Sequence, residues 1–187
     1  MNLLRWLGFD AAAGGGEEAA DSAGDTETVR KIVARLEALP PERARFVAAF
    51  AYVLSRVAHA DLDITAEETG KMEEILRADG HLPEDQAVLV VEIAKAQSRL
   101  FGGTENYLVT RELAGLATAG ERREVLDCLF AVAAADGGIS SPEEVQIRQV
   151  ASELGFTHEE FVAARSAWRE HRDVLKGLPG RRQGEGR

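Results

Sequence analysis

The sequence predicts an all-α fold, a helical bundle of about eight helices in two pseudo-symmetric four-helix halves. Ala and Leu outnumber the β-branched residues, as is typical of helical proteins. Apolar residues recur at spacings of three and four, and no sustained alternating run indicates a strand. In addition, a stretch that leads from an apolar helix through an acidic turn occurs twice, with Asp61 and Asp136 separated by 136 − 61 = 75 residues.

The same offset pairs other residues along the two copies without a gap. It matches Leu54 with Leu129 and Gly80 with Gly155. Neither half alone offers much core, because short domains bury a smaller fraction of their surface. We therefore expect the two halves to pack together about a pseudo-twofold axis.

The chain divides into three regions by composition. Residues 1–25 form a short apolar segment and an acidic linker that we expect to be disordered. The helical domain covers 26–176, with halves at about 26–101 and 102–176, and a flexible basic tail follows at 177–187.

Four helices are expected in the first half, over about 26–39, 41–60, 66–79 and 83–101. Proline ends the first of them, and Pro41 suits the first turn of the second. The second helix carries a wide apolar stripe and should be central. Gly80 suits the C-terminal cap of the third helix.

Four further helices are expected over about 104–119, 121–135, 141–154 and 158–176, with Gly120 ending the first of these. Their apolar positions should face the core, among them Tyr107, Leu108, Leu113, Leu116, Val145, Ile147 and Val150. Thr157 and Glu160 form a capping box at the start of the last helix.

Charge and cysteine content narrow the classes of protein. The net charge of −10 disfavours a nucleic-acid binder and favours cations over phosphates as partners. Cys128 is the only cysteine, so no intramolecular disulfide forms, and its apolar surroundings indicate a buried small side chain. The longest apolar run, 129–135, is far shorter than the roughly 20 residues that span a bilayer. We expect a cytoplasmic protein.

Residues 2–9 form a separate apolar segment, with Leu3, Leu4, Trp6 and Leu7 on one side of a short helix. Such a segment can dock on its own domain, on a protein partner or peripherally on a membrane surface.

The repeated acidic turn has a structural interpretation. Asp61 and Asp136 stand at the end of an apolar helix, where a carboxylate is mildly unfavourable against the helix dipole. Each can compensate by accepting backbone N–H groups of the turn. The next helices then start with capping boxes, Thr65 with Glu68 and Ser140 with Glu143. In the second copy, Ser141 followed by Pro142 offers a competing start.

The same residues also suit a divalent cation, and this alternative stays open. Clustered carboxylates repel one another, and hard oxygen ligands fit Ca²⁺ or Mg²⁺. The candidate ligands are Asp61, Asp63, Glu67 and Glu68 in the first copy and Asp136, Glu143 and Glu144 in the second. The first copy is richer but is no EF-hand, because Ala66 replaces the required Gly and Met72 stands where the bidentate Glu belongs.

No catalytic pattern stands out. The chain has no zinc-ligand spacing, no phosphate-cradling Gly loop after a strand and no Ser/His/Asp order that suggests a triad. We therefore predict a protein that is not an enzyme.

The second copy of the repeated stretch resembles the TerB family of tellurite-resistance proteins and their relatives. An alanine-rich helix ends at Asp136, a glycine follows, and Ile139 precedes a small residue and Glu143. The resemblance covers about 26–176 and is weaker in the first half, where Leu62 and Asp63 replace two glycines.

This resemblance implies an all-helical, internally pseudo-symmetric domain with a role in tellurite or broader stress response. TerB-like domains are thought to act in membrane-associated complexes with a suspected metal link, and they are not known as enzymes. The acids that match the family pattern are Asp136 and Glu143, then Asp61 and Glu68.

Overall fold

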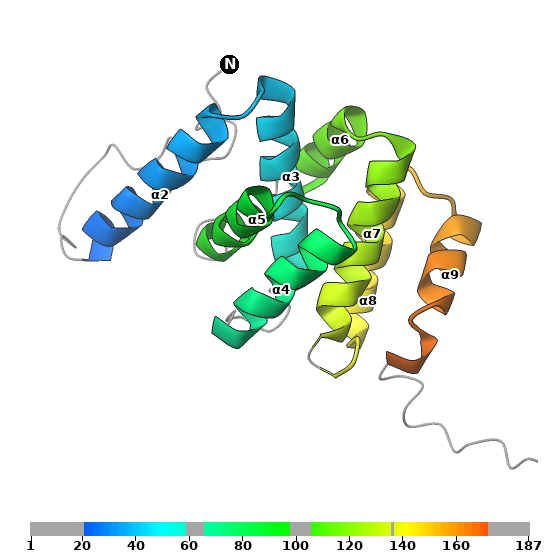
Figure 1. Ribbon diagram of the computed structural model, residues 1–187. Helices are drawn as coiled ribbons and strands as arrows, with labels where there is room; N and C mark the ends of the chain where they lie inside the picture. Colours follow the sequence, from blue (N-terminus) through cyan, green and yellow to red (C-terminus); the bar gives the residue numbers. More distant parts are fainter. Residues whose placement is uncertain (1–20, 59–65, 98–105, 136, 172–187) are drawn as a thin grey trace, which may run out of the picture.

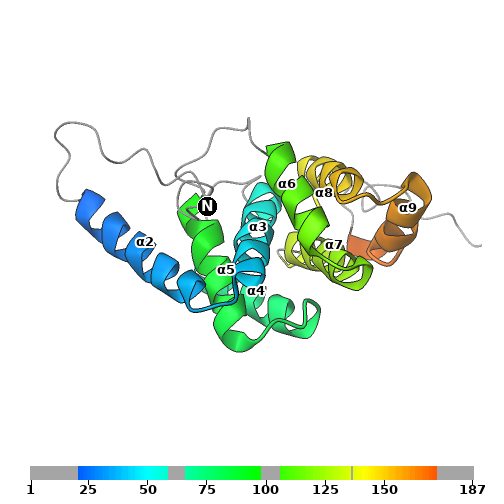
Figure 2. The same ribbon diagram turned by 90° about the horizontal axis from the view of Figure 1, so that it is seen from above.

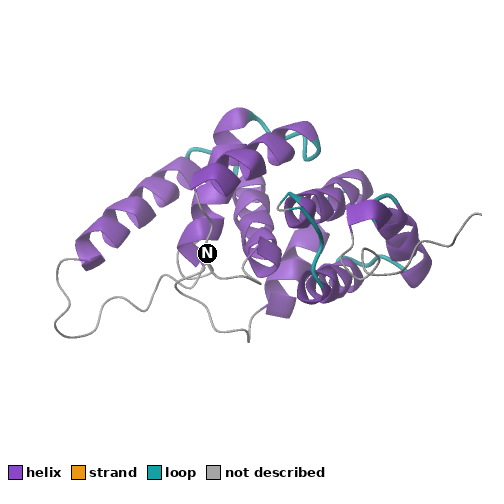
Figure 3. Cartoon of the chain, turned by 90° about the horizontal axis from the view of Figure 1, so that it is seen from below, coloured by secondary structure: helices purple, strands orange, loops and turns teal. Residues whose placement is uncertain are grey.

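The computed structural model describes residues 21–58, 66–97, 106–135 and 137–171. Every regular element in these ranges is a helix, as predicted (Figure 3). The α-helices are α2 (Asp21–Glu37), α3 (Pro41–Ala58), α4 (Ala66–Ala78), α5 (Glu84–Gln97), α6 (Asn106–Leu116), α7 (Ala119–Ala134), α8 (Ser141–Glu153) and α9 (His158–Ser166), followed by the 3-10 helix η3 (Arg169–His171).

Helix α3 lies at the centre of the molecule (Figures 1 and 2). It contacts α5 of its own half and α6, α7 and α8 of the other half. Most of its length from Phe46 to Val57 is buried, because its apolar stripe is wide and many of its other positions are Ala. Phe46 meets Phe50 edge-on, with ring centroids 6.1 Å apart. The expected central position of this helix is confirmed.

Helix α7 is the corresponding core helix of the second half. Phe130 is fully buried and stacks on Phe161 of α9 and on Trp168, with centroids 6.0 Å and 6.3 Å away. Cys128 is also fully buried, and burial, with nearby Asp79, raises the pKa of its thiol. The side chain therefore packs as a small neutral group, as expected from the sequence.

The two halves correspond most closely in α4 and α8. Adding 75 to the bounds of α4 gives 66 + 75 = 141 and 78 + 75 = 153, which are the bounds of α8. The first helix of each half, however, takes a different position: α2 packs on α5 and α3, whereas α6 packs on α3 and α8. The pseudo-twofold relation between the remaining helices stays a prediction.

Two predicted helix ends are wrong. Gly120 does not end a helix but lies in the first turn of α7, which begins after the N-cap Thr118 and its capping partner Glu121. The side chain of Thr118 accepts from the backbone N–H of Glu121 at 3.2 Å. A glycine costs little there, because first-turn N–H groups lack intrahelical partners in any case.

The second wrong end is that of the last helix, which was expected to continue to residue 176. Instead α9 ends at Ser166, and η3 follows. Trp168 N–H donates to the Arg165 carbonyl and His171 N–H to the Trp168 carbonyl, both at 3.1 Å. These tighter bonds end the α-helical path at the point where the Trp168 ring stacks on Phe130.

Helix α2 begins at Asp21, 26 − 21 = 5 residues before the expected start, so part of the supposed linker is helical. The expectations for residues 2–9, for the linker up to residue 20 and for the tail beyond 171 lie outside the described residues. None of the described helices is both long and apolar enough to cross a bilayer.

Three residues expected in the core are instead exposed. Tyr107 is 52 % exposed, Leu108 is 67 % exposed and Val145 is 48 % exposed. Helix α6 turns the face with Val109 and Leu113 inward, so Leu113 is buried as expected while Tyr107 and Leu108 point away from the core. The neighbours of α6 and α8 thus decide which part of a broad apolar pattern becomes the core.

Candidate functional site

The second acidic corner joins α7 to α8. After α7 the chain turns through Gly137, whose φ of 100° is in the left-handed region that favours glycine. Ile139 then inserts into the core at 1 % exposure. Asp136, which was expected to organise this turn, lies outside the described residues.

Helix α8 starts with the predicted capping box. The Ser140 N–H donates to Glu143 Oε2 at 2.7 Å, and the Glu143 N–H donates to Ser140 Oγ at 3.4 Å. Ser140 is the N-cap, so the competing start at Ser141 is wrong. Pro142 lies in the first turn, where its lack of a backbone N–H costs no intrahelical hydrogen bond. The Glu143 side chain is buried where it folds back onto the Ser140 N–H.

The other acid of this corner connects helices. Glu144 Oε1 accepts from Arg165 Nη1 of α9 at 2.9 Å, in a pair that is largely shielded from solvent. Arg165 also lies over the Phe161 ring, 5.6 Å from its centroid. The Ile139 N–H donates to the His171 carbonyl at 2.6 Å, which fastens the turn to η3. The described acids of the second corner therefore have structural partners.

The first acidic corner lies between α3 and α4. Asp61, Asp63 and the expected cap Thr65 fall outside the described residues. Glu67 lies in the first turn of α4, but its side chain is likewise outside them, and Glu68 is half-buried in the same turn. The described ranges hold no group of three or more His, Cys, Asp or Glu side chains arranged to bind a metal. The cation hypothesis for this corner stays a prediction.

A buried polar cluster between the two halves was not foreseen from the sequence. Arg56 of α3 donates through Nη1 to Glu153 Oε2 of α8 at 2.7 Å and to Thr110 Oγ1 of α6 at 2.8 Å. The Arg56 and Glu153 side chains are only 5 % and 7 % exposed. Gln149 adds a hydrogen bond to Glu153 Oε1 at 3.0 Å. The sequence signal for this cluster was a single arginine near the end of the apolar stretch 46–57.

The hydrogen-bond partners of Glu153 stabilise its ionised form. Burial tends to raise its pKa, but the hydrogen bonds from Arg56 and Thr110 outweigh burial and bring the pKa below its ordinary value. The cluster thus connects α3, α6 and α8 through hydrogen bonds of Arg56, although one buried donor of this arginine, Nε, has no partner among the described residues.

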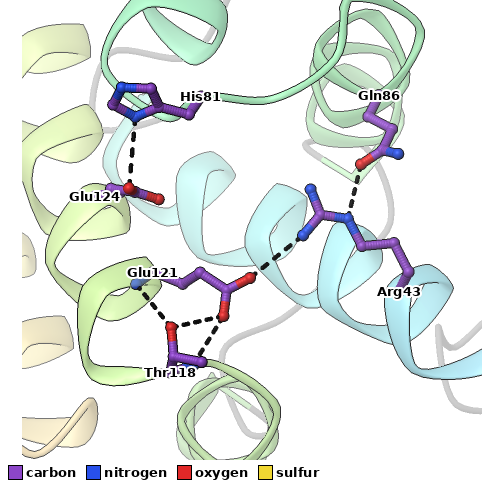
Figure 4. A network of polar contacts seen from close by, with 6 residues as sticks. All are labelled: Arg43, His81, Gln86, Thr118, Glu121 and Glu124. Carbon is purple, nitrogen blue, oxygen red and sulfur yellow. Dashed lines mark hydrogen bonds and ion pairs between the residues drawn. The ribbon is translucent and has the colours of Figure 1, made fainter.

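A more exposed polar network connects α3, α5 and α7 (Figure 4). Arg43 Nε donates to Gln86 Oε1 at 2.8 Å, and Arg43 Nη1 lies 3.5 Å from Glu121 Oε1. His81 Nδ1 lies 3.4 Å from Glu124 Oε1, and the His81 side chain is 71 % exposed. These groups pair locally, and pairs this exposed contribute little to stability.

Taken together, these features define the class of protein. It is an all-α domain in which an acidic corner joins α7 to α8 and the buried Arg56–Glu153 pair connects the two halves.

The comparison with protein families identifies the particular family. The family model described as "Tellurite resistance protein TerB" matches residues 46–166, which is 121 of the 187 residues, and the chain belongs to the TerB family. The resemblance read from the second corner is confirmed. No curated protein and no solved structure gives a match.

Proposed function

We propose that this TerB-family protein is a non-enzymatic binding or scaffold module in a cytoplasmic tellurite or broader stress response, with other proteins as partners. The observation that carries the proposal is the family match over 46–166, which includes both acidic corners. A divalent cation, Ca²⁺ or Mg²⁺, is its candidate small ligand.

The first corner is the better candidate for that cation. Glu143 and Glu144 of the second corner are engaged with Ser140 and Arg165, so using them as ligands would disturb a helix cap and a helix–helix contact. The first corner adds Asp63, which has no counterpart at Gly138 in the second. Hard carboxylate oxygens in close sequence suit these cations.

Calorimetric titration with Ca²⁺ and Mg²⁺ tests this assignment. We expect binding in the sub-millimolar range for the wild type, loss of binding in Asp61→Asn/Asp63→Asn, and retention in the matched variant Asp136→Asn. The Asn variants preserve side-chain size and remove only charge. An absence of heat for the wild type, or equal binding by all three proteins, would refute the cation role of the first corner.

A second candidate function is a helical interaction module whose acidic corners are purely structural. The engagement of Glu143 and Glu144 within the fold favours it. In this case the N-terminal segment 2–9 would recruit the protein to a partner or membrane surface. Flotation with anionic liposomes tests the membrane form of recruitment: the full chain should float, and a chain lacking residues 1–9 should not. Equal flotation of both would exclude that segment as an anchor.

A further inference from the structure

Helix α2 is attached to the domain by only part of its length. Its first turns extend away from the other helices (Figures 1 and 2). Ile32 and Leu36, four residues apart, are 1 % and 0 % exposed, whereas Arg30 and Lys31 are exposed. The main neighbours of α2 are α5 and α3. Two fully buried aliphatic side chains thus anchor this long helix, and both reach the hydrophobic core beneath it.

One polar side chain completes the attachment. Arg35 Nη1 donates to Glu92 Oε2 at 2.5 Å, and Arg35 Nη2 donates to the Asp85 carbonyl at 2.9 Å. The Arg35 and Glu92 side chains are 37 % and 44 % exposed, so their ion pair adds little stability and mainly orients α2 on α5. The surface under α2 therefore has an apolar floor and an acidic edge on α5.

Helix α3 is a separate helix and does not continue α2. Only residues 38–40 separate the two helices, and Pro41 prevents one continuous helix, because proline lacks the N–H that such a helix would use. The Ala44 N–H donates to the Pro40 carbonyl at 2.9 Å, so α3 begins its own hydrogen-bond ladder. In addition, α2 lies wholly outside the family match, which starts at residue 46.

We propose that α2 is a displaceable strap, and that the α5/α3 surface beneath it binds an amphipathic helix of a partner protein. The strap shows what such a helix must carry: two large aliphatic residues four positions apart, with a basic residue just before the second. The apolar pair fills the positions of Ile32 and Leu36, and the basic residue meets Glu92. This is the helix-in-groove mode of recognition, with α2 as the competing occupant. The inference rests on the proposed role as a binding module and names its protein-binding surface.

Hydrogen exchange on the full chain tests whether the strap opens. Amides of residues 32–37 should exchange at least about tenfold faster than those of residues 46–57, because α2 opens locally while α3 opens with the whole core. Equal protection of the two helices would overturn the proposal.

Competition in trans tests the surface itself. A fluorescent peptide of residues 21–39 is added to the full-length wild type and to full-length Ile32→Ala/Leu36→Ala, and fluorescence anisotropy is measured. The variant should bind the peptide on the order of a hundredfold more tightly, because in the wild type the tethered strap competes at high effective concentration. A peptide carrying the same two alanines is the matched control and should not bind.

Each other outcome contradicts the proposal. Failure of the variant to bind, or equal binding by wild type and variant, would show that the surface does not accept a helix in trans. Loss of the cooperative thermal transition in the variant would show that α2 belongs to the core. Peptide binding should be unchanged in Asp61→Asn/Asp63→Asn, so a failed cation site and a failed helix-binding surface are distinguishable.

Discussion

Gly80 and Gly155 stand at the same position of the two halves, since 155 − 80 = 75, yet they are needed for different physical reasons. Gly155 has φ = 90°, a left-handed conformation, and only Arg122 Nη1 lies near its missing Cβ, at 3.5 Å. A Cβ on Gly80 would lie 2.7 Å from the Leu76 carbonyl oxygen and 3.0 Å from Cys128 Sγ. Gly155 is required for its backbone conformation, and Gly80 is required for its lack of volume.

The reason for the difference lies in how α4 ends and in what packs against that end. The left-handed residue after α4 is His81, with φ = 49°, rather than Gly80 as the sequence suggests. Gly80 is buried beside α7, and a methyl group there would overlap the Leu76 carbonyl oxygen and crowd the thiol of Cys128. Gly155 is exposed at the end of α8. The same residue type, at positions 75 residues apart, thus serves two different purposes because its surroundings differ.

The largest expected effect comes from breaking the buried ion pair between Arg56 of α3 and Glu153 of α8. Arg56→Met leaves Glu153 buried without its cation, and we expect a loss of about 3–5 kcal/mol in the free energy of unfolding, measured with denaturant. Arg123→Met is the matched control: its pair with Asp127 is 47 % and 36 % exposed, so the loss should be below about 1 kcal/mol. Similar losses in both variants would contradict the importance of the buried pair.

The same pair should make stability depend on pH. Because the folded-state pKa of Glu153 lies below its ordinary value, the pair stabilises the protein above the unfolded-state pKa of about 4.3. This contribution is lost as the pH falls through the folded-state pKa. The stability difference between wild type and Glu153→Gln, measured by denaturant unfolding, should therefore be full at neutral pH and shrink under acid. A difference that does not change with pH would contradict this.

Gly80→Ala should have the next largest effect, a loss of about 1–3 kcal/mol, because the new methyl group overlaps a backbone oxygen. The matched control is Gly70→Ala within α4, the helix that precedes Gly80, where no atom lies within 4 Å of the new Cβ. That control should gain up to about 1 kcal/mol, since alanine is the better helix former. Thermal unfolding measures both, and effects of equal sign would refute the steric role of Gly80.

Gly155→Ala should cost about 1–2 kcal/mol, because an L-residue other than glycine is strained at this φ. Gly155→Asn should cost less than Gly155→Ala, since Asn tolerates the left-handed conformation better. At Gly80, where the limit is space, the larger Asn should instead be worse than Ala. Chemical denaturation of these four variants tests whether the order of Ala and Asn reverses between the two positions.

Removal of the cap at the second corner should have the smallest effect. Ser140→Ala frees the Glu143 N–H from its side-chain partner and should cost about 1 kcal/mol. Thr157→Ala removes the equivalent bond at α9, 3.2 Å long, and should cost a similar amount. Thermal unfolding measures both. A cost at Ser140 several times that at Thr157 would show that this corner does more than start a helix.

Much of the fold could be predicted because its signals are local. The bounds of α3, α4 and α8 follow from apolar spacing and from Pro41, and the boxes at Ser140 and Thr157 need only four consecutive residues. The box at Thr118 carries the same signal, but Gly120, between the Thr and the Glu, is also typical of a helix end and so predicts the wrong boundary. At the candidate site, the sequence predicted the structural role of Glu143 but not the pairing of Glu144 with Arg165.

The sequence by itself determined the helical class, the family and most helix starts, because each is signalled by residues within a few turns of one another. Tertiary structure alone decided that Tyr107 faces outward, that Gly80 is limited by volume, and that Arg56 meets Glu153, 97 residues away. Periodicity specifies that a helix has an apolar side. It cannot specify which distant helix will cover that side, or which charges will then be enclosed together.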